Sequence, residues 1–209
     1  MTSKKITEEL NRLLPNADTE LEFFSPYELL VVVILSAQCT DKRVNMVTRE
    51  LFKEYNTPEK ILTLSQGQLE EKIHSCGFYR NKAHNILKAS QDIVTKFNGE
   101  VPSDFDDLCS LAGVGRKTAN VMVSVAFGGA GFAVDTHVLR VSNRLGLTTS
   151  NNPDKVELEL KSFFDKKDWS KLHHQMVLFG RYKCKSQNPD CTDCPFQKIC
   201  LHFNNVVKG

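Results

Sequence analysis

The chain has 209 residues, of which 41% are hydrophobic, and a formal net charge of +2, which is too small to identify a class of partner. A chain of this length buries roughly 70% of the surface that its unfolded form exposes, so it supports one large domain or two small ones. No apolar run reaches the ~18 residues of a membrane-spanning helix, and the N-terminal lysines precede an amphipathic segment, so we expect a soluble, unsecreted globular protein.

Apolar residues recur at helical spacing along most of the chain, beginning with Ile6, Leu10 and Leu13, and sustained strand alternation is absent. Proline, asparagine and serine signals mark the helix boundaries. They lie at Pro15, at Ser25-Pro26 opening a helix over 26–37, at Thr57-Pro58, at Asn98-Gly99, at Pro102 and at Asn151-Asn152-Pro153. The pattern predicts an all-α fold of about ten helices.

A helical hairpin is predicted over about 104–127. The segment 104–111 predicts a short helix, Ala112 to Gly115 a tight turn, and 116–127 a second helix that is apolar on all sides and therefore buried. Because Gly113 and Gly115 have no Cβ, backbone N–H groups at the helix start can approach an anion such as phosphate. The alternative is that Gly-Val-Gly only joins two helices.

Lys117 follows Arg116 at the start of that second helix. A lysine is a nucleophile only as the free amine, and the reference pKa of a lysine is about 10.4. A helix dipole worth at most about 2 kcal/mol lowers the pKa of a lysine by only about one pH unit. A nucleophilic lysine therefore also needs desolvation in a cleft and the repulsion of a neighbouring cation. A phosphate-binding or solvated Lys117 is the alternative.

Asp135 precedes a further apolar-periodic segment, which makes it a candidate N-cap. A carboxylate opposite an amine has a second use, because it can stabilise developing positive charge and assist deprotonation of the attacking group. His137, Arg140 and Arg144 share one face of the predicted helix, from which they can reach phosphates, although a solvated face explains the same spacing.

Four cysteines lie within a short C-terminal segment, in the pattern C-x6-C-x2-C-x5-C, while Cys39, Cys76 and Cys109 are scattered. The four are Cys184, Cys191, Cys194 and Cys200. This clustering indicates metal ligation rather than a disulfide framework, and thiolate sites fit a reducing cytosol. One CxxC flanked by single cysteines favours an iron–sulfur cubane, and a structural zinc site is the alternative.

Taken in order, these motifs resemble a known family over nearly the whole chain. They are LSAQCTD (35–41), CGFYRNKA (76–83), LAGVGRKTAN (111–120), AVDTHVLRVSNRLG (133–146), FGRYKC (179–184) and the four terminal cysteines. The hairpin and the later aspartate are similar to the signature of the helix-hairpin-helix-GPD DNA glycosylase superfamily, and the set is similar to the endonuclease III family in its iron–sulfur branch.

The resemblance implies a two-lobed helix-hairpin-helix DNA glycosylase fold with a [4Fe-4S] cluster loop. Residues 22–132 would form a helical barrel-like domain that contains the hairpin. Residues 1–21 would join 133–209 in an iron–sulfur cluster domain, with Cys184, Cys191, Cys194 and Cys200 holding the cluster in the loop 184–200. The active-site cleft would lie between the two domains, with Lys117 on one wall and Asp135 on the other.

The implied activity is that of a bifunctional DNA glycosylase and AP lyase of base excision repair, acting on oxidised or damaged pyrimidines in double-stranded DNA. Lys117 would attack the sugar C1′, displace the base and form a Schiff base, from which β-elimination cuts the strand 3′ to the abasic site. Asp135 would stabilise the charge that builds on the sugar.

The residues expected to contact DNA come from several segments. Gln38 and Phe78 would fill the gap that an extruded nucleotide leaves. The remaining candidates for DNA contact are Gly113, Gly115, Arg116, His137, Arg140, Lys183 and Lys185. A core position for Phe78 and a helix-surface position for Gln38 are the alternatives.

The partner is therefore damaged or abasic duplex DNA and no membrane, and we expect a cytoplasmic, nucleoid-associated monomer of prokaryotic source. An adenine-mismatch glycosylase relative shares the cluster spacing, but it lacks the lysine and extends beyond the cluster, whereas Lys117 is present here and nine residues follow Cys200. A non-catalytic helix-hairpin-helix DNA-binding protein is the second alternative. The chain departs from the family at Ala112, where a proline is usual, and at Cys109, where some relatives have a glutamate.

Overall fold

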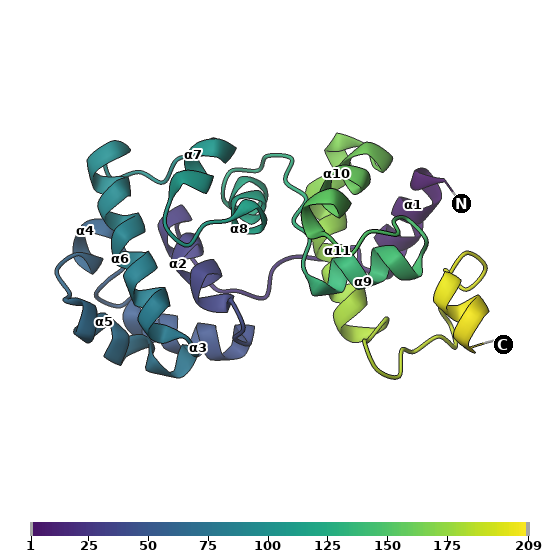
Figure 1. Cartoon of the computed structure of the whole chain (residues 1–209), viewed down its shortest axis with the longest axis horizontal. Helices are drawn as coiled ribbons and strands as arrows, with labels where there is room; N and C mark the ends of the chain where they lie inside the picture. Colours follow the sequence, from purple (N-terminus) through teal and green to yellow (C-terminus); the bar gives the residue numbers. More distant parts are fainter. Residues whose placement is uncertain (1, 208–209) are drawn as a thin grey trace. The chain divides into compact units, whose positions relative to one another are not determined.

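The computed structural model describes residues 2–207 and contains no β-strand among them, as the helical periodicity predicts. The chain divides into two units (Figure 1). Unit 1 combines the residues up to Thr19 with those from Gly129 onward, and unit 2 is Glu20–Gly128. The family resemblance implies a first domain over residues 22–132. Residues 1, 208 and 209, the ends of the predicted cluster domain, lie outside the described range.

Unit 2 is built from seven α-helices, a short 3-10 segment and a π-helical turn. In chain order they are α2 (Pro26–Ser36), α3 (Asp41–Leu51), α4 (Pro58–Ile61), α5 (Gln66–Ile73), η1 (His74–Cys76), α6 (Tyr79–Lys96), α7 (Phe105–Ser110), α8 (Arg116–Val121) and η2 (Met122–Ala126). Ser25 caps α2 by accepting from Glu28 N, and Pro26 occupies its first position, as the Ser-Pro signal predicts.

The core of unit 2 surrounds α2, in which every residue from Tyr27 to Leu35 is buried. A helix that is apolar on all sides must be covered on all sides. Helix α2 packs against α3, α6 and α8, while α6 also packs against α4 and α5 (Figure 1). This central helix ends at Ser36, immediately before the loop that carries Gln38, so a rigid element positions that loop.

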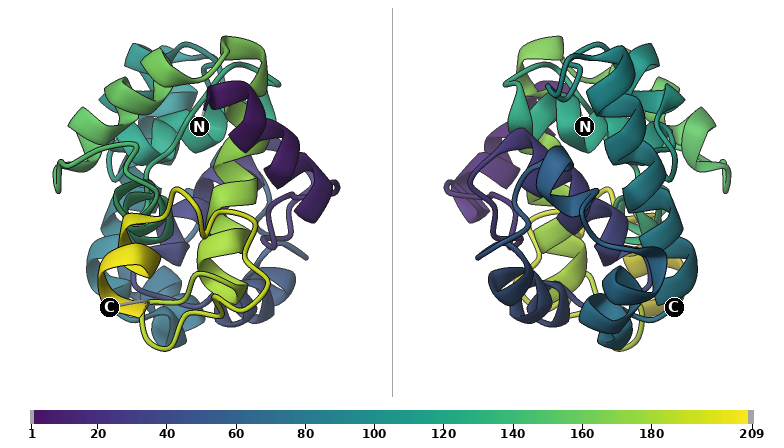
Figure 2. Two further views of the ribbon diagram at one scale, coloured as in Figure 1. Left: turned by 90° about the vertical axis from the view of Figure 1, so that its right-hand side faces the viewer. Right: turned by 90° about the vertical axis from the view of Figure 1, so that its left-hand side faces the viewer.

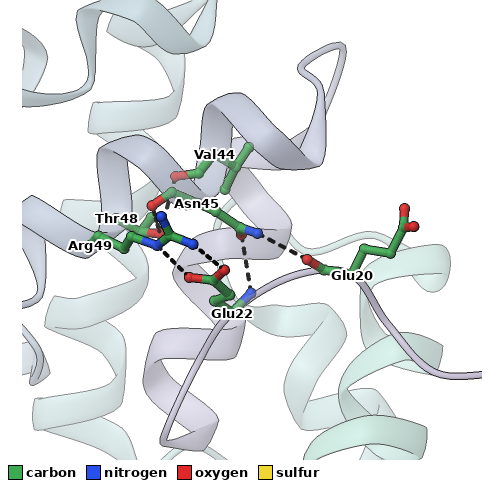
Figure 3. Close-up of polar contacts among 6 residues, drawn as sticks. All are labelled: Glu20, Glu22, Val44, Asn45, Thr48 and Arg49. Carbon is green, nitrogen blue, oxygen red and sulfur yellow. Dashed lines mark hydrogen bonds and ion pairs between the residues drawn. The ribbon is translucent and has the colours of Figure 1, made fainter.

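The first residues of unit 2 are fastened to α3 (Figure 3). The buried Asn45 side chain donates from Nδ2 to Glu20 O at 2.9 Å and accepts from Glu22 N at 3.1 Å. The amide therefore binds the main chain of the segment 20–22 at two points. Arg49 donates two hydrogen bonds to the Glu22 carboxylate of the same segment, and these bonds lower the pKa of Glu22. This ion pair is exposed and therefore adds little stability, whereas the amide bridge fixes the path of the chain.

Unit 1 contains α1 (Ser3–Leu13), α9 (Thr136–Arg144), α10 (Pro153–Phe163), η3 (Lys166–Asp168), α11 (Trp169–Tyr182) and η4 (Phe203–Val207). Helix α11 packs against α9 and against α1 (Figure 2, left). The buried Gln175 of α11 donates to Asn11 Oδ1 and to Leu14 O, both at 3.0 Å, which joins the N-terminal helix to the C-terminal part of the chain. None of the helices in residues 2–207 has the length and apolar character needed to cross a bilayer.

The predicted helix ends agree with the structure to within a residue or two at most positions. The expected helix over 26–37 is observed at 26–36, and the first hairpin helix, expected over 104–111, is observed at Phe105–Ser110 with Asp104 as its N-cap. The second hairpin helix departs from expectation, because its α-helical part ends at Val121 and a π-helical turn follows to Ala126. Apolar residues on all sides identify a buried helix but do not reveal a change of helical type.

Candidate functional site

The turn of the hairpin needs glycine at one position and only permits it at the other. Gly113 has φ +78°, and a Cβ there would lie 2.9 Å from the Cβ of Asn85, so both backbone and space exclude other residues. Gly115 has φ −94° and ψ 178°, and a Cβ there would meet nothing within 4 Å. Both glycines are exposed while Val114 between them is buried. The open space beside Gly115 faces outward from the hairpin and can admit a ligand.

Lys117 is the second residue of α8 and is exposed. Gly115 caps this helix without a side-chain hydrogen bond, so its first N–H groups have no capping side chain. The guanidinium of the neighbouring Arg116 lies over the Phe105 ring, 5.0 Å from its centroid, which directs it along α7. Because Lys117 is exposed, its side chain is open to a ligand that approaches the hairpin turn.

Asp135 is the N-cap of α9, as the sequence predicts. Its Oδ1 accepts hydrogen bonds from His137 N at 2.9 Å and Val138 N at 2.8 Å, and the side chain is half-buried. No hydrogen bond to Oδ2 occurs among residues 2–207. The carboxylate is therefore fixed through one oxygen and presents the other. Lys117 belongs to unit 2 and Asp135 to unit 1.

Gln38 and Phe78 are exposed residues in left-handed backbone conformations. Gln38 has φ +51° in the turn after α2, and Phe78 has φ +50° at the N-cap of α6. Such conformations of non-glycine residues cost about 1–3 kcal/mol each and are concentrated at functional sites. Phe78 is 69% exposed, so the alternative of a core aromatic is wrong. Gln38 lies beyond the end of α2, which corrects the alternative of a helix-surface position.

Arg140 contacts the main chain of its own unit. Nε donates to Cys184 O at 3.1 Å, Nη2 donates to Gly180 O at 2.7 Å, and Nη2 also lies 3.2 Å from His137 Nδ1. Burial lowers the pKa of Arg140. The predicted helical face is thus occupied by internal bonds that hold α9 to the end of α11. A Cβ on Gly180 would lie 2.9 Å from that of His137, so the close approach of the two helices needs this glycine.

Arg144 makes further hydrogen bonds of this kind to the main chain of the cysteine loop. Nη1 donates to Lys185 O at 2.6 Å and lies 3.4 Å from Cys184 Sγ, and Nη2 donates to Ser186 O at 3.0 Å. Helical spacing alone places Arg140 and Arg144 on one face but does not identify what that face meets. The sequence therefore missed that these arginines hold the loop.

The cysteines converge on one pocket of unit 1, whose apolar wall includes Phe179 and Phe203. The four that line it are Cys184, Cys191, Cys194 and Cys200. Burial and the neighbouring thiols raise the pKa values of Cys191 and Cys194. Within residues 2–207, no three His, Cys, Asp or Glu side chains are close enough to hold one metal ion. A tetrahedral zinc site needs all four sulfurs about 2.3 Å from one point, whereas a cubane takes one thiolate at each of its separate irons.

The two lysines predicted on this loop differ in their surroundings. Lys183 pairs with Asp190 at 3.0 Å and is half-buried, and this pairing lowers the pKa of Asp190. Lys185 is exposed, and its carbonyl accepts a hydrogen bond from Arg144. Of the pair, Lys185 therefore has the side chain that can reach an external phosphate.

Comparisons with known proteins identify similar sequences and similar structures. A family model described as "HhH-GPD superfamily base excision DNA repair protein" matches residues 31–166. Endonuclease III of Bacillus subtilis (strain 168) is 50% identical over 194 residues, which are 92% of this chain and 89% of that protein. A solved non-covalent complex of endonuclease III with DNA is similar over 100% of both chains, with TM-score 0.95 and 46% identity. A trapped covalent intermediate of endonuclease III with DNA is similar over 98% of both chains, with TM-score 0.93 and 48% identity.

Proposed function

Because the chain belongs to the HhH-GPD superfamily of base excision repair proteins, and within it to the endonuclease III family, we propose that Lys117 and Asp135 carry its reaction on damaged DNA. The protein is a DNA glycosylase and AP lyase, and its partner is DNA that contains damaged bases or abasic sites. One observation carries the residue assignment: Lys117 lies two residues after Gly115, where the glycine turn is open to a ligand.

The amine of Lys117 attacks C1′ of the damaged nucleotide, and the bond from C1′ to the base breaks with its electron pair leaving on the base. The proton lost by the amine passes to Asp135, whose Oδ2 is not engaged by α9, and the ionised form of this carboxylate offsets the positive charge on the sugar. This displacement leaves C1′ bonded to the lysine nitrogen and to O4′. The C1′–O4′ bond then breaks with its electron pair on O4′, which takes up the proton held by Asp135, and the C1′=N double bond of the Schiff base forms. The Schiff base acidifies C2′, and loss of a C2′ proton to water with departure of the 3′ phosphate cuts the strand. Bound DNA covers the exposed lysine and excludes water from the reacting atoms.

The damaged nucleotide has to leave the helix before this attack. Gln38 offers amide donors and acceptors to the partner base left behind, and the exposed ring of Phe78 enters the stack. Gly113, Gly115 and Arg116 receive the phosphates beside the lysine. His137, Arg140 and Lys183 serve the duplex indirectly by holding α9 and the cysteine loop, and Lys185 contacts phosphate.

A [4Fe-4S] cluster would be held by the four thiolates of the pocket in unit 1. When bound, such a cluster supplies a covalent cross-link whose binding free energy adds to that of folding. The segment 184–200 contains no helix or strand, so the chain alone gives this loop little regular hydrogen bonding. Arg140 and Arg144 bind its first carbonyls and thereby fix where the loop leaves α11.

The substrate of a DNA repair glycosylase is chromosomal DNA, so the enzyme acts in the compartment that contains the chromosome. The curated relatives are bacterial proteins, and the compartment that we propose is accordingly the cytoplasm, with the protein associated with the nucleoid through DNA. A monomer suffices for the reaction, because both proposed catalytic residues come from one chain.

The test is covalent trapping on a duplex that contains a single abasic site, in the presence of borohydride. The parent protein is expected to form a cross-link, Lys117→Gln to form none, and Lys166→Gln, which removes an exposed lysine of η3, to behave as the parent. Trapping that persists in Lys117→Gln would mean that another amine is the nucleophile. Binding without trapping by the parent would favour a non-catalytic module, and release of mispaired adenine without trapping would favour the adenine-mismatch relative.

A further inference from the structure

The loops that carry Gln38 and Phe78 share one buried cation. Lys82 of α6 is 5% exposed, and its Nζ donates to Leu35 O at 2.8 Å and to Cys76 O at 2.5 Å. Leu35 lies near the end of α2, just before Gln38, and Cys76 lies just before Gly77 and Phe78. One ammonium group therefore ties together the main chains from which the two loops emerge.

Further backbone bonds complete this arrangement. The Lys82 N–H donates to Phe78 O at 3.1 Å, so the lysine binds the chain on both sides of Gly77. Cys39 N donates to Ser36 O at 3.1 Å, which closes the turn around Gln38. Gln38, Gly77 and Phe78 all have positive φ, of 51°, 45° and 50°. The two non-glycine residues, Gln38 and Phe78, are strained in this conformation and persist only where surrounding contacts over-determine them, and Lys82 supplies such contacts.

Burial of a charged group at the position of Lys82 costs desolvation free energy. Burial lowers its pKa, and the nearby Cys39 and Cys76 thiols oppose that change. An apolar side chain of similar length would fill the space without the desolvation cost. Both acceptors of the ammonium are main-chain carbonyls, so the charge fixes the path of the backbone rather than pairing with a carboxylate.

We propose that Lys82 is a positioning residue for the opening of the duplex: it holds Gln38 and Phe78 at the spacing with which they enter the helix beside the extruded nucleotide. This inference rests on the proposed function, which assigns DNA contact to those two side chains. Lys82 is buried, so it acts through them and not on the DNA.

The experiment compares trapping rates on an abasic duplex with those on the same abasic strand alone, which has no stack to open and no partner base to meet. Lys82→Met removes the ammonium at nearly constant volume. Lys88→Met, which removes an exposed lysine of the same helix, is the matched control. Misplacement of a positioning group by about 1 Å can cost about 100-fold, so we expect the duplex rate of Lys82→Met to fall by about 10- to 100-fold and its single-strand rate by less than about twofold.

Two further measurements connect the loss to the loops. Fluorescence of 2-aminopurine placed opposite a stable abasic analogue reports unstacking of the partner base, and its rise on binding should be smaller for Lys82→Met than for the parent. The effect of Lys82→Met on the duplex should also shrink in a Phe78→Ala background, because coupled residues are not additive. If Lys82→Met does not fold, Lys82→Arg keeps the charge but displaces both acceptors, and the same excess loss on the duplex is expected.

Equal losses on duplex and single strand, or no loss on either, would overturn the proposal with either variant. Failure of the parent protein to trap on both substrates would instead overturn the proposed function, so the two failures can be distinguished.

Discussion

Asp135 has two roles that a pair of substitutions can separate. As the N-cap of α9 its Oδ1 accepts two backbone hydrogen bonds, at 2.9 and 2.8 Å, and as a carboxylate it faces the reacting sugar in the proposed mechanism. Asparagine preserves the capping oxygen and removes the charge, whereas alanine removes both. Loss of the charge at a helix N-terminus costs about 0.3–1 kcal/mol, and loss of the cap costs about 1 kcal/mol.

These values predict different melting temperatures and similar activities for the two variants. A chain of this size loses about 2–4 °C for each kcal/mol, so Asp135→Asn should melt within about 4 °C of the parent and Asp135→Ala at a lower temperature than Asp135→Asn. Both should lose about 10²- to 10⁴-fold in the rate of base release, which is the usual contribution of a general base. Thermal melts by circular dichroism and single-turnover release of an oxidised pyrimidine measure the two quantities.

A second N-cap in unit 1 provides the control. Asn152 caps α10 through Oδ1, which accepts from Asp154 N at 2.9 Å and from Lys155 N at 3.2 Å. Asn152→Ala should therefore lower the melting temperature as a lost cap does, and leave base release unchanged. Full activity of Asp135→Asn would refute the chemical role of the carboxylate, and equal melting of Asp135→Asn and Asp135→Ala would refute the capping argument.

Three further outcomes are expected. Gly113→Ala should reduce the free energy of unfolding by about 1–2 kcal/mol, because alanine is strained in the left-handed conformation, and should therefore lower the melting temperature. Gly115→Ala should leave the melting temperature unchanged and weaken duplex binding. Unaltered binding by Gly115→Ala would exclude phosphate from that side of the turn. Burial lowers the pKa of His174, so the folded state binds fewer protons there than the unfolded state and stability should fall as pH drops below about 6.5. The fall in melting temperature between pH 7.5 and 5.5 should be smaller in His174→Gln, and parallel curves would contradict this cause. Ser90 Oγ donates to Ile86 O and accepts from Tyr27 OH at 2.6 Å, so Tyr27→Phe should cost unit 2 about 1 kcal/mol in a urea melt, and an unchanged midpoint would contradict that contribution.

Local signals in the sequence were sufficient for most helix starts, for the hairpin turn and for the clustering of the cysteines. Ser25 and Asp135 cap the helices that they were expected to begin, because an N-cap depends only on the few residues that follow it. The glycine turn of the hairpin is likewise local, and the structure separates its two glycines by the sign of φ. The clustering of the four cysteines in one pocket follows from their short spacing.

Contacts between distant segments were not predictable from the same signals. The arginines of α9 were expected to face phosphate, yet Arg140 binds the carbonyls of Gly180 and Cys184, because the spacing along a helix defines a face but not its neighbour. Lys82 resembled any other lysine of an amphipathic helix, and only the folded chain brings the carbonyls of Leu35 and Cys76 to it. An exposed aromatic such as Phe78 also cannot be distinguished from a core aromatic by composition.

The division of the chain into units has a consequence for its synthesis. Unit 2 is one continuous segment, so a nascent chain that has left the ribosome as far as Gly128 already contains everything that this unit needs to fold. Unit 1 must wait, because α1 precedes unit 2 in the chain and its partner α11 follows unit 2, so Gln175 can join Asn11 only after unit 2 has been synthesised. The cysteine loop follows still later, so a ribosome that stalls before Cys184 would release a chain that contains the glycine hairpin but lacks the four cysteines of the pocket in unit 1.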